Sequence, residues 1–301
     1  MQTRGPFVVA AAVALALTAC SGSATGRPGT TPSTSTDGVP VTPRATAPAA
    51  IAAVARMTEQ LDGARTGTFR QKATTRGDSF TLDQVTETSF DLGRQAWMGR
   101  THFEANPPSA FDTDFSQADM RVVVADGTAY MTMLSWPTTL RGRWLAVDPG
   151  AGPAAGPQGL SGEPFAVLAL RGFTGMSVVP SSDGTSTIKG HIDLGSAVGL
   201  LGVRPGVVKA GIDPSTLKGR AYATVVTDAQ GLPTTLTVDG HDIFGATQLP
   251  EKLSTLLPRQ IVEVRFEQLG SPVDVAVPAS STLIDPAEMD AGDPTGATPS
   301  T

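Results

Sequence analysis

Hydrophobic and polar positions change their period early in the chain. From Ala49 to Leu61 the apolar side chains recur at helical spacing, and Gly63 is placed to end the helix. From Thr66 onward the pattern is that of strands, and in the last strand apolar and charged residues alternate strictly. The segments predicted as strands are 66–75, 79–92, 95–104, 120–125, 128–134, 143–147, 173–179, 186–194, 219–227, 232–239 and 260–269.

Turn signals support an antiparallel arrangement of these strands. Arg76-Gly77-Asp78 separates the first two, and Asp126-Gly127 is a strong signal for a short hairpin. Two apolar segments, 164–170 and 196–203, are predicted as helical turns. The expected class is α+β: a large antiparallel sheet with an opening helix and a small helical insertion. Because one apolar sheet face must be covered, imperfectly packed helices would leave a cavity.

The first twenty residues have the pattern of a secretion leader. Arg4 precedes an apolar run, Phe7–Ala16, which is too short for an ordinary membrane-spanning helix. Leu17–Cys20 resembles the bacterial lipobox, which implies cleavage before Cys20 and attachment of diacylglycerol to its sulfur. Cys20 is the only cysteine among 301 residues, so no internal disulfide is possible. The alternatives are an ordinary signal peptide with a chance cysteine, or an N-terminal anchor helix.

Composition divides the remaining chain into a spacer, a domain and a tail. Residues 21–48 are rich in Ser, Thr, Gly, Pro and Ala, and 286–301 are similar and acidic. The expected organisation is a lipoprotein signal peptide at 1–19, a lipidated N-terminus and disordered linker at 20–48, one domain at 49–285 and a disordered tail at 286–301. No apolar run after the leader is long enough to span a bilayer. The expected location is the outer face of the cytoplasmic membrane, with the lipid on Cys20 as the anchor.

Signals for chemistry are weak. The net charge is −6 with no basic cluster, which argues against a nucleic-acid partner. His102, His191 and His241 are far apart in sequence, and a zinc site would need clustered ligands. The chain has no Gly-x-Ser-x-Gly nucleophile elbow, no phosphate-binding loop and no dinucleotide fingerprint. We therefore expect no catalytic residue, no metal and no cofactor, and a protein that is not an enzyme.

Five segments, taken in order, carry a family resemblance. They are VVVADGTAYM (122–131), RGRWLAVDP (141–149), GTSTIKGHIDL (184–194), TDAQGLPTTLTV (227–238) and VRFEQLGSPVDVAVP (264–278). From Ala49 to Asp285 the chain resembles the actinobacterial LppX/LprG lipoprotein family, whose fold is similar to that of the LolA and LolB lipoprotein carriers. The resemblance implies a large curved half-barrel sheet with a few short helices packed on its concave face. It also implies an apolar cavity that holds the acyl chains of a lipid or glycolipid.

The apolar residues of the strands and helical turns supply the candidate site. The expected cavity-lining residues are Trp97, Phe103, Met131, Met133, Phe165, Leu168, Val198, Leu200 and Leu201. Flexible methionine suits irregular apolar ligands. The hypothesis is a membrane-anchored lipoprotein that binds and carries an acylated lipid or glycolipid, with an envelope transport protein as a further partner. The alternatives are an envelope interaction module with the same fold and a filled core, and a hydrolase with an unrecognised site.

Overall fold

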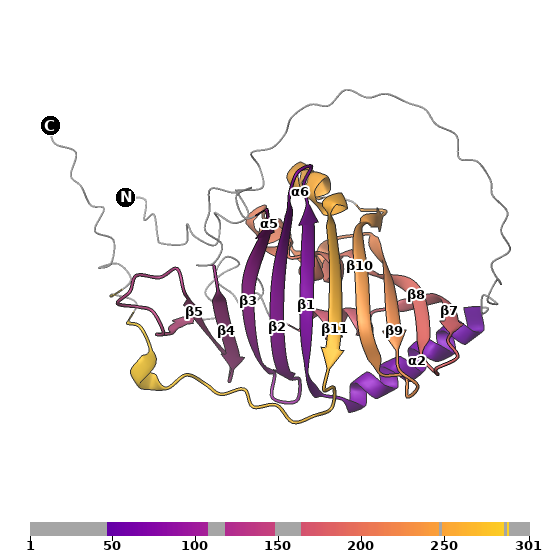
Figure 1. Ribbon diagram of the computed structural model, residues 1–301, viewed down its shortest axis with the longest axis horizontal. Helices are drawn as coiled ribbons and strands as arrows, with labels where there is room; N and C mark the ends of the chain where they lie inside the picture. Colours follow the sequence, from indigo (N-terminus) through magenta and orange to yellow (C-terminus); the bar gives the residue numbers. More distant parts are fainter. Residues whose placement is uncertain (1–46, 108–117, 148–163, 247–248, 286–287, 289–301) are drawn as a thin grey trace, which may run out of the picture. The chain divides into compact units, whose positions relative to one another are not determined.

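The structure, a computed structural model, describes residues 47–107, 118–147, 164–246, 249–285 and 288 (Figure 1). The expected leader, the lipidation site at Cys20, most of the linker and the tail beyond Glu288 therefore lie outside the described residues.

The opening helix is α2 (Ala47–Gly63). It begins two residues earlier than the apolar period predicts, because Pro48 is tolerated in a first turn, where its missing N–H would have no partner. Ala50, Met57 and Leu61 are fully buried on one face of this helix. That face packs chiefly against strand β7 (Thr174–Pro180) and helix α3 (Phe165–Arg171).

Eleven strands of the described chain form one antiparallel sheet, in the order β6-β5-β4-β3-β2-β1-β11-β10-β9-β8-β7 (Figure 1). Each of the eleven segments predicted as strands is confirmed. Besides β7, the strands are β1 (Thr66–Arg76), β2 (Thr81–Asp91), β3 (Ala96–Asn106), β4 (Met120–Ala125), β5 (Thr128–Met133), β6 (Leu145–Val147), β8 (Ser186–Asp193), β9 (Arg220–Thr227), β10 (Pro233–Phe244) and β11 (Gln260–Glu267).

Two meanders build this sheet. Strands β1 to β6 follow one another to one edge, and β11 to β7 run in reverse order to the other edge. The two meanders are joined by the pairing of the first strand with the last, in which Phe69 lies opposite Phe266. Strand β10 is longer than predicted, because it continues through a register shift between Val238 and Ile243. The sheet therefore depends on a contact between residues almost 200 positions apart, as the Thr68 hydroxyl bond to the Glu267 carbonyl shows.

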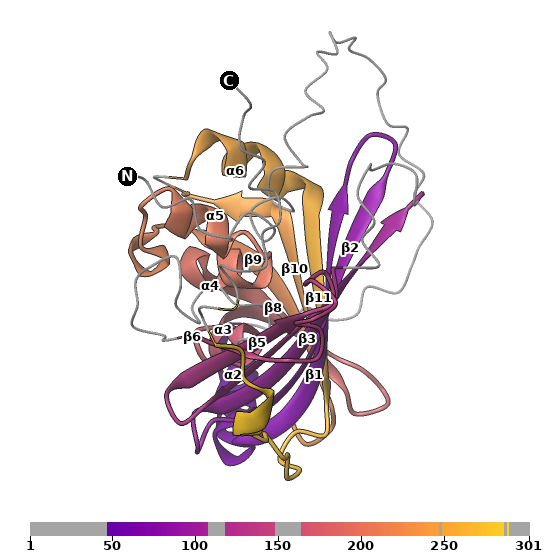
Figure 2. The ribbon, with the colours of Figure 1, turned by 90° about the vertical axis from the view of Figure 1, so that its left-hand side faces the viewer.

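The helices lie on one side of the curved sheet (Figure 2). Besides α2 and α3 they are α4 (Leu194–Leu200), α5 (Arg204–Lys209), α6 (Glu251–Leu256) and the 3-10 turns η5 (Pro214–Thr216) and η6 (Leu257–Arg259). A further 3-10 turn, η7 (Ser280–Thr282), belongs to the segment after β11. The expected helical turns correspond to α3 and α4, whereas α5 and α6 were not predicted. Each of those two has only 6 residues, which is too short for a helical period to emerge. The α+β class with short helices on one sheet face is confirmed.

The main core fills the space between these helices and the sheet. Phe90, Leu170, Ile188, Leu200 and Leu236 are among its fully buried side chains. Strands β8 and β9 alternate as the sequence predicts, with every second side chain in the core. Asp193 ends β8 and begins α4, because its carboxylate accepts a hydrogen bond of 2.8 Å from the Ser196 backbone N–H.

After β11 the chain forms a C-terminal strap, residues 270–285, along the other side of the sheet. In Figure 1 the strap runs from β11 to the side of the sheet where β4 and β5 lie. Val275 is buried there against Ala96, Val123 and Ala125. At the sheet edge Leu283 pairs in parallel with Trp144, and the next side chain of the strap is buried in a small apolar cluster with Trp136 and Leu140. The strap thus covers the backbone edge beside β6, which would otherwise be open to other strands.

An ion pair beyond the strap gives a first prediction. The Arg143 guanidinium donates hydrogen bonds to both carboxylate oxygens of Glu288, and these bonds lower the pKa of that carboxyl. A depressed folded-state pKa means that the pair is intact above the ordinary carboxyl value, about 4.3, and is lost as the pH falls through the lowered value. We expect Arg143→Gln to raise the Glu288 pKa toward the ordinary value in a carboxyl NMR titration.

The matched control for this titration is Asp183. Hydrogen bonds from the Thr185 side chain and backbone lower its pKa independently of Arg143. The Asp183 pKa should therefore stay low in the variant. An unchanged Glu288 pKa in Arg143→Gln would contradict the assigned pair.

Candidate functional site

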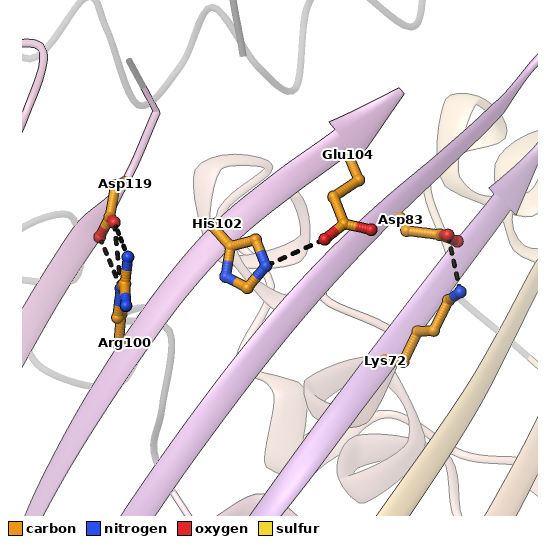
Figure 3. A network of polar contacts seen from close by, with 6 residues as sticks. All are labelled: Lys72, Asp83, Arg100, His102, Glu104 and Asp119. Atoms are coloured by element: carbon orange, nitrogen blue, oxygen red, sulfur yellow. Dashed lines mark hydrogen bonds and ion pairs between the residues drawn. The ribbon is translucent and has the colours of Figure 1, made fainter. Parts of the chain in front are cut away.

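The two faces of the β1–β4 half of the sheet differ in chemistry. Figure 3 shows the outer face, where Lys72 pairs with Asp83 at 2.8 Å and Arg100 pairs with Asp119. On the same face His102 lies 3.3 Å from Glu104. Exposed pairs of this kind contribute only about 0–1 kcal/mol each. The outer face is therefore solvated around these pairs, as the alternation in β3 predicts, whereas the strap covers Ala96, Val123 and Ala125 farther along it.

The three histidines are not gathered into a reactive site. His102 lies on β3, His191 on β8 and His241 on β10. Burial lowers the pKa of His191, whose Nδ1 is buried without a hydrogen-bond partner and whose ring meets Phe244 edge-on at 6.3 Å. The described ranges contain no group of three or more His, Cys, Asp or Glu side chains arranged to hold a metal.

The inner face, toward the helices, can be followed in rows across the strands. Residues opposite each other in an antiparallel register share a face. The first row consists of Phe90, Trp97, Val124, Ala129 and Val147, from β2 to β6. All but Val147 are buried. The main core therefore extends across this end of the strands.

Farther along the same strands, burial decreases. The next rows, again from β2 toward the β6 edge, are Thr88, Gly99, Val122, Met131 and Leu145, then Thr86, Thr101, Met120 and Met133, then Gln84 and Phe103. Five apolar side chains in these rows are only partly buried, namely Phe103, Met120, Met131, Met133 and Leu145. We call these five residues the methionine face.

Polar side chains adjoin the methionine face on β2 and β3. The hydroxyls of Thr86 and Thr101 are buried and lie 2.9 Å apart in a hydrogen bond. Gln71 on β1 donates a 2.8 Å hydrogen bond to the Leu200 carbonyl of α4. A helix backbone is thereby bonded to the sheet, so the inner face combines an apolar band with a few satisfied polar groups. This is the composition of small-molecule sites in general.

The end of helix α4 approaches both strand β2 and helix α3. An ideal Cβ on Gly202, just after α4, would lie 3.2 Å from the Gln84 side chain, which is opposite Phe103 in the register. One turn earlier, an ideal Cβ on Gly199 would lie 3.0 Å from the Phe165 ring. Glycines at these positions let the helix approach both side chains. Gln84 and Phe165 therefore lie near the same end of α4.

The structure distributes the nine predicted lining residues over three environments. Trp97, Val198, Leu200 and Leu201 are buried in the main core, whereas Leu168 on α3 is 42% exposed. The remaining four are partly buried, namely Phe103, Met131, Met133 and Phe165. The four residues from strands share the inner face of the sheet, and the other five lie on α3 and α4 or directly after α4.

Two members of the methionine face were not among the predicted residues. Met120 begins the segment MRVVVA, where alternation places it on the same face as Val122 and Val124. That signal was available in the sequence. Leu145 had no such signal, because β6 has only 3 residues and its face is set by pairing with Met131.

No helix in the described part of the chain is both long and apolar enough to cross a membrane.

Comparisons with known proteins match this chain through structure rather than sequence. None of the protein-family models and none of the curated proteins matches it. Among solved structures, LppX of Mycobacterium tuberculosis is 13% identical, with 76% of this chain and 99% of that chain covered and a TM-score of 0.38. LprF of Mycobacterium bovis is 11% identical, with 78% and 99% covered and a TM-score of 0.43.

The MucA/MucB complex of Pseudomonas aeruginosa is 14% identical, with 79% of this chain and 62% of that chain covered and a TM-score of 0.26. Two of the solved structures that match this chain are thus the lipoprotein LppX and LprF, both at low sequence identity.

Proposed function

We propose that this protein is an envelope lipoprotein, anchored through Cys20 at the outer face of the cytoplasmic membrane, that binds and carries an acylated lipid or glycolipid. The observation that carries the proposal is the methionine face. It is a set of partly buried apolar side chains on the side of the sheet opposite the charged face, and two of them, Met120 and Met131, pack against the filled core.

The ligand lies beside the main core in this proposal, not at its centre. Trp97, Val198, Leu200 and Leu201 already pack against other side chains of the core. Met131 contacts both the main core and the small cluster of Trp136, Leu140 and Ile284, so the methionine face bridges the two. An acyl chain lying there would bury apolar surface of its own and of the protein.

The energy available suits an acyl ligand. Each methylene removed from water contributes about 0.8 kcal/mol, whereas association costs about 4–15 kcal/mol before any affinity appears. A chain of about ten buried methylenes therefore offsets a cost in the lower half of that range. Methionine adapts to a flexible hydrocarbon because its side chain is unbranched and polarisable.

The polar side chains beside the methionine face suit a protein that binds and transfers its ligand without covalent chemistry. The polar groups in the rows of the methionine face are threonines and Gln84. None of these is a general acid or base at neutral pH. The linker of residues 21–48 would span roughly 90 Å if fully extended, which lets the tethered domain reach a donor or acceptor in the envelope.

The second candidate is an envelope interaction module without a lipid ligand. The observation that favours it is the extent of the filled core, which takes up four of the predicted lining residues. On this alternative the outer edge of β7, the last strand of the described sheet, would pair with a partner strand. It requires that the purified protein carries no lipid.

The full chain, expressed with its leader in an actinobacterium, tests the proposal. We expect one non-covalent acylated lipid per protein in native mass spectrometry, identified after organic extraction. Met133→Glu should reduce the lipid-bound fraction by about tenfold or more, because it places a charge against the acyl chain. Met98→Glu is the matched control, since Met98 lies on the opposite face of β3 and is 39% exposed.

The control should retain the wild-type lipid content. A wild-type protein that purifies without lipid and takes none up from vesicles would refute the proposal in favour of the interaction module. Equal lipid loss in Met133→Glu and Met98→Glu would remove the methionine face as the site.

A further inference from the structure

Arg204 is a cation in an apolar setting. It is the first residue of α5, between Val203 and Val207, which are 5% and 0% exposed. Its own side chain is partly buried. The guanidinium carbon lies over the Phe165 ring, 4.9 Å from the ring centroid, which is the geometry of a cation–π contact. Phe165, the first residue of α3, is partly buried and lies beside Gly199 of α4.

One hydrogen-bond donor of this guanidinium is unused among the residues that the structure describes. Its Nε is buried and has no hydrogen-bond partner. Among the residues that the structure describes, Arg204 forms no ion pair, whereas five other arginines each pair with a carboxylate, namely Arg100, Arg143, Arg171, Arg259 and Arg265. Leaving a buried donor unsatisfied costs about 1–3 kcal/mol, so such a group in a folded protein calls for an explanation.

The acid that Arg204 influences is already engaged elsewhere. The Asp213 carboxylate accepts a 2.9 Å hydrogen bond from the Ser215 backbone N–H at the start of η5. Hydrogen bonds from Ser215 are the main reason that the pKa of Asp213 is lowered, and the positive charge of Arg204 is a smaller cause. Asp213 therefore does not supply the missing partner for the Arg204 Nε.

A short series of neighbouring residues leads from Arg204 to the methionine face. Phe165 packs against Gly199 of α4, and Gly202, two residues before Arg204, lies beside Gln84. Gln84 is opposite Phe103 of the methionine face. Gln84 thus lies between the segment just before Arg204 and Phe103, which relates the guanidinium to this end of the methionine face.

We infer that Arg204 binds the anionic headgroup of the carried lipid, and that the ligand is therefore an anionic acyl lipid and not a neutral one. This inference rests on the proposed function, because it assigns the headgroup of the same ligand. A planar guanidinium donates two parallel hydrogen bonds to a phosphate or carboxylate, and stacking on Phe165 holds the plane in place. A neutral headgroup without an acceptor of this kind would leave the buried Nε unsatisfied.

Competition between two lipids with the same acyl chains tests the inference. Dioleoylphosphatidylglycerol and dioleoylglycerol are offered together to the full-length protein in phosphatidylcholine vesicles, and protein-bound lipid is quantified by mass spectrometry. We expect the wild type to prefer the anionic lipid by about tenfold, the size expected of one charge-assisted interaction. Arg204→Gln should abolish the preference while retaining uptake of dioleoylglycerol.

Two further variants distinguish a local role from net charge and from folding. Arg70→Gln removes the same charge from an exposed residue of β1 whose side chain lies on the outer face, and it should keep the wild-type preference. Arg204→Lys keeps the charge without the planar fork and should retain only part of the preference. Circular dichroism melting curves show whether each variant remains folded.

The outcomes separate the inference from the proposed function. Equal uptake of both lipids by the wild type, or an unchanged preference in folded Arg204→Gln, would overturn the inference and leave the carrier function standing. Uptake of neither lipid would refute the function and the inference together. Inorganic phosphate that binds at Arg204 in a calorimetric titration, with no lipid preference in the wild type, would identify a free anion as the ligand and also overturn the inference.

Discussion

Cys20→Ser is expected to move the protein from the membrane fraction to the soluble fraction. In the lipobox interpretation the thiol of Cys20 carries the anchor, and a serine hydroxyl does not replace it. Each buried methylene stabilises membrane association by about 0.8 kcal/mol, and stable anchoring takes about two acyl chains. Loss of the whole anchor should therefore change the distribution from nearly complete retention to nearly complete release.

Fractionation after an alkaline wash, together with the intact mass, measures this effect. The wild-type mass should correspond to a chain that begins at Cys20 and carries covalent lipid. Ser21→Ala is the control, since it alters a residue just outside the lipobox and should remain in the membrane. Retention of Cys20→Ser in the membrane would support the N-terminal anchor helix instead. A wild-type protein that is soluble and unlipidated would indicate an ordinary signal peptide.

Gly190→Ala is expected to destabilise the domain more than any other alanine substitution proposed for it. Gly190 lies on the core side of β8, and an ideal Cβ there would lie 2.1 Å from the Thr174 carbonyl oxygen and 2.7 Å from the Phe173 ring. The carbonyl belongs to the neighbouring strand, so it cannot move without disturbing the β7–β8 pairing. Overpacking costs about 1–3 kcal/mol and occasionally more, and a backbone clash belongs at the upper end.

We therefore expect a loss of about 3 kcal/mol and a fall in Tm of about 10 °C for a domain of this size. Gly63→Ala is the matched control. Nothing lies within 4 Å of an ideal Cβ on Gly63 at the end of α2, so that variant should have nearly wild-type stability. Chemical denaturation of the two variants measures the difference. Equal stabilities would mean that β7 and β8 are not packed as closely as the structure places them.

Local patterns explain why the strands were predictable. Alternation in β8 and β9 and the Asp126-Gly127 turn depend only on residues that are neighbours in the sequence. The strand pairing in the folded structure agrees with these local patterns. The same reasoning missed α5 and α6, since six residues do not establish a period. It also ended β10 too early, because the register shift after Val238 interrupts the alternation.

The candidate site was predictable only in part. Met131 and Met133 are two residues apart on β5, so their side chains lie on the same face of the strand. The register with β4 shows that this is the inner face. For the helical residues, apolar character did not distinguish a core position from an exposed one. Leu200 is fully buried and Leu168 is 42% exposed, although both are leucines in helices of 7 residues. The orientation of such short helices is set by what they pack against.

Sequence patterns alone indicated the class of the domain, the location of the eleven strands in the described residues, the separation of a charged face from an apolar one in β3, and the single cysteine available for an anchor. The tertiary structure decided what depends on distant residues. It paired β1 with β11, laid the strap over the β6 edge, and placed Arg204 over Phe165 with its Nε unsatisfied. The physical reason is that periodicity reports which side chains avoid water, whereas register and helix docking depend on packing between segments far apart in the chain.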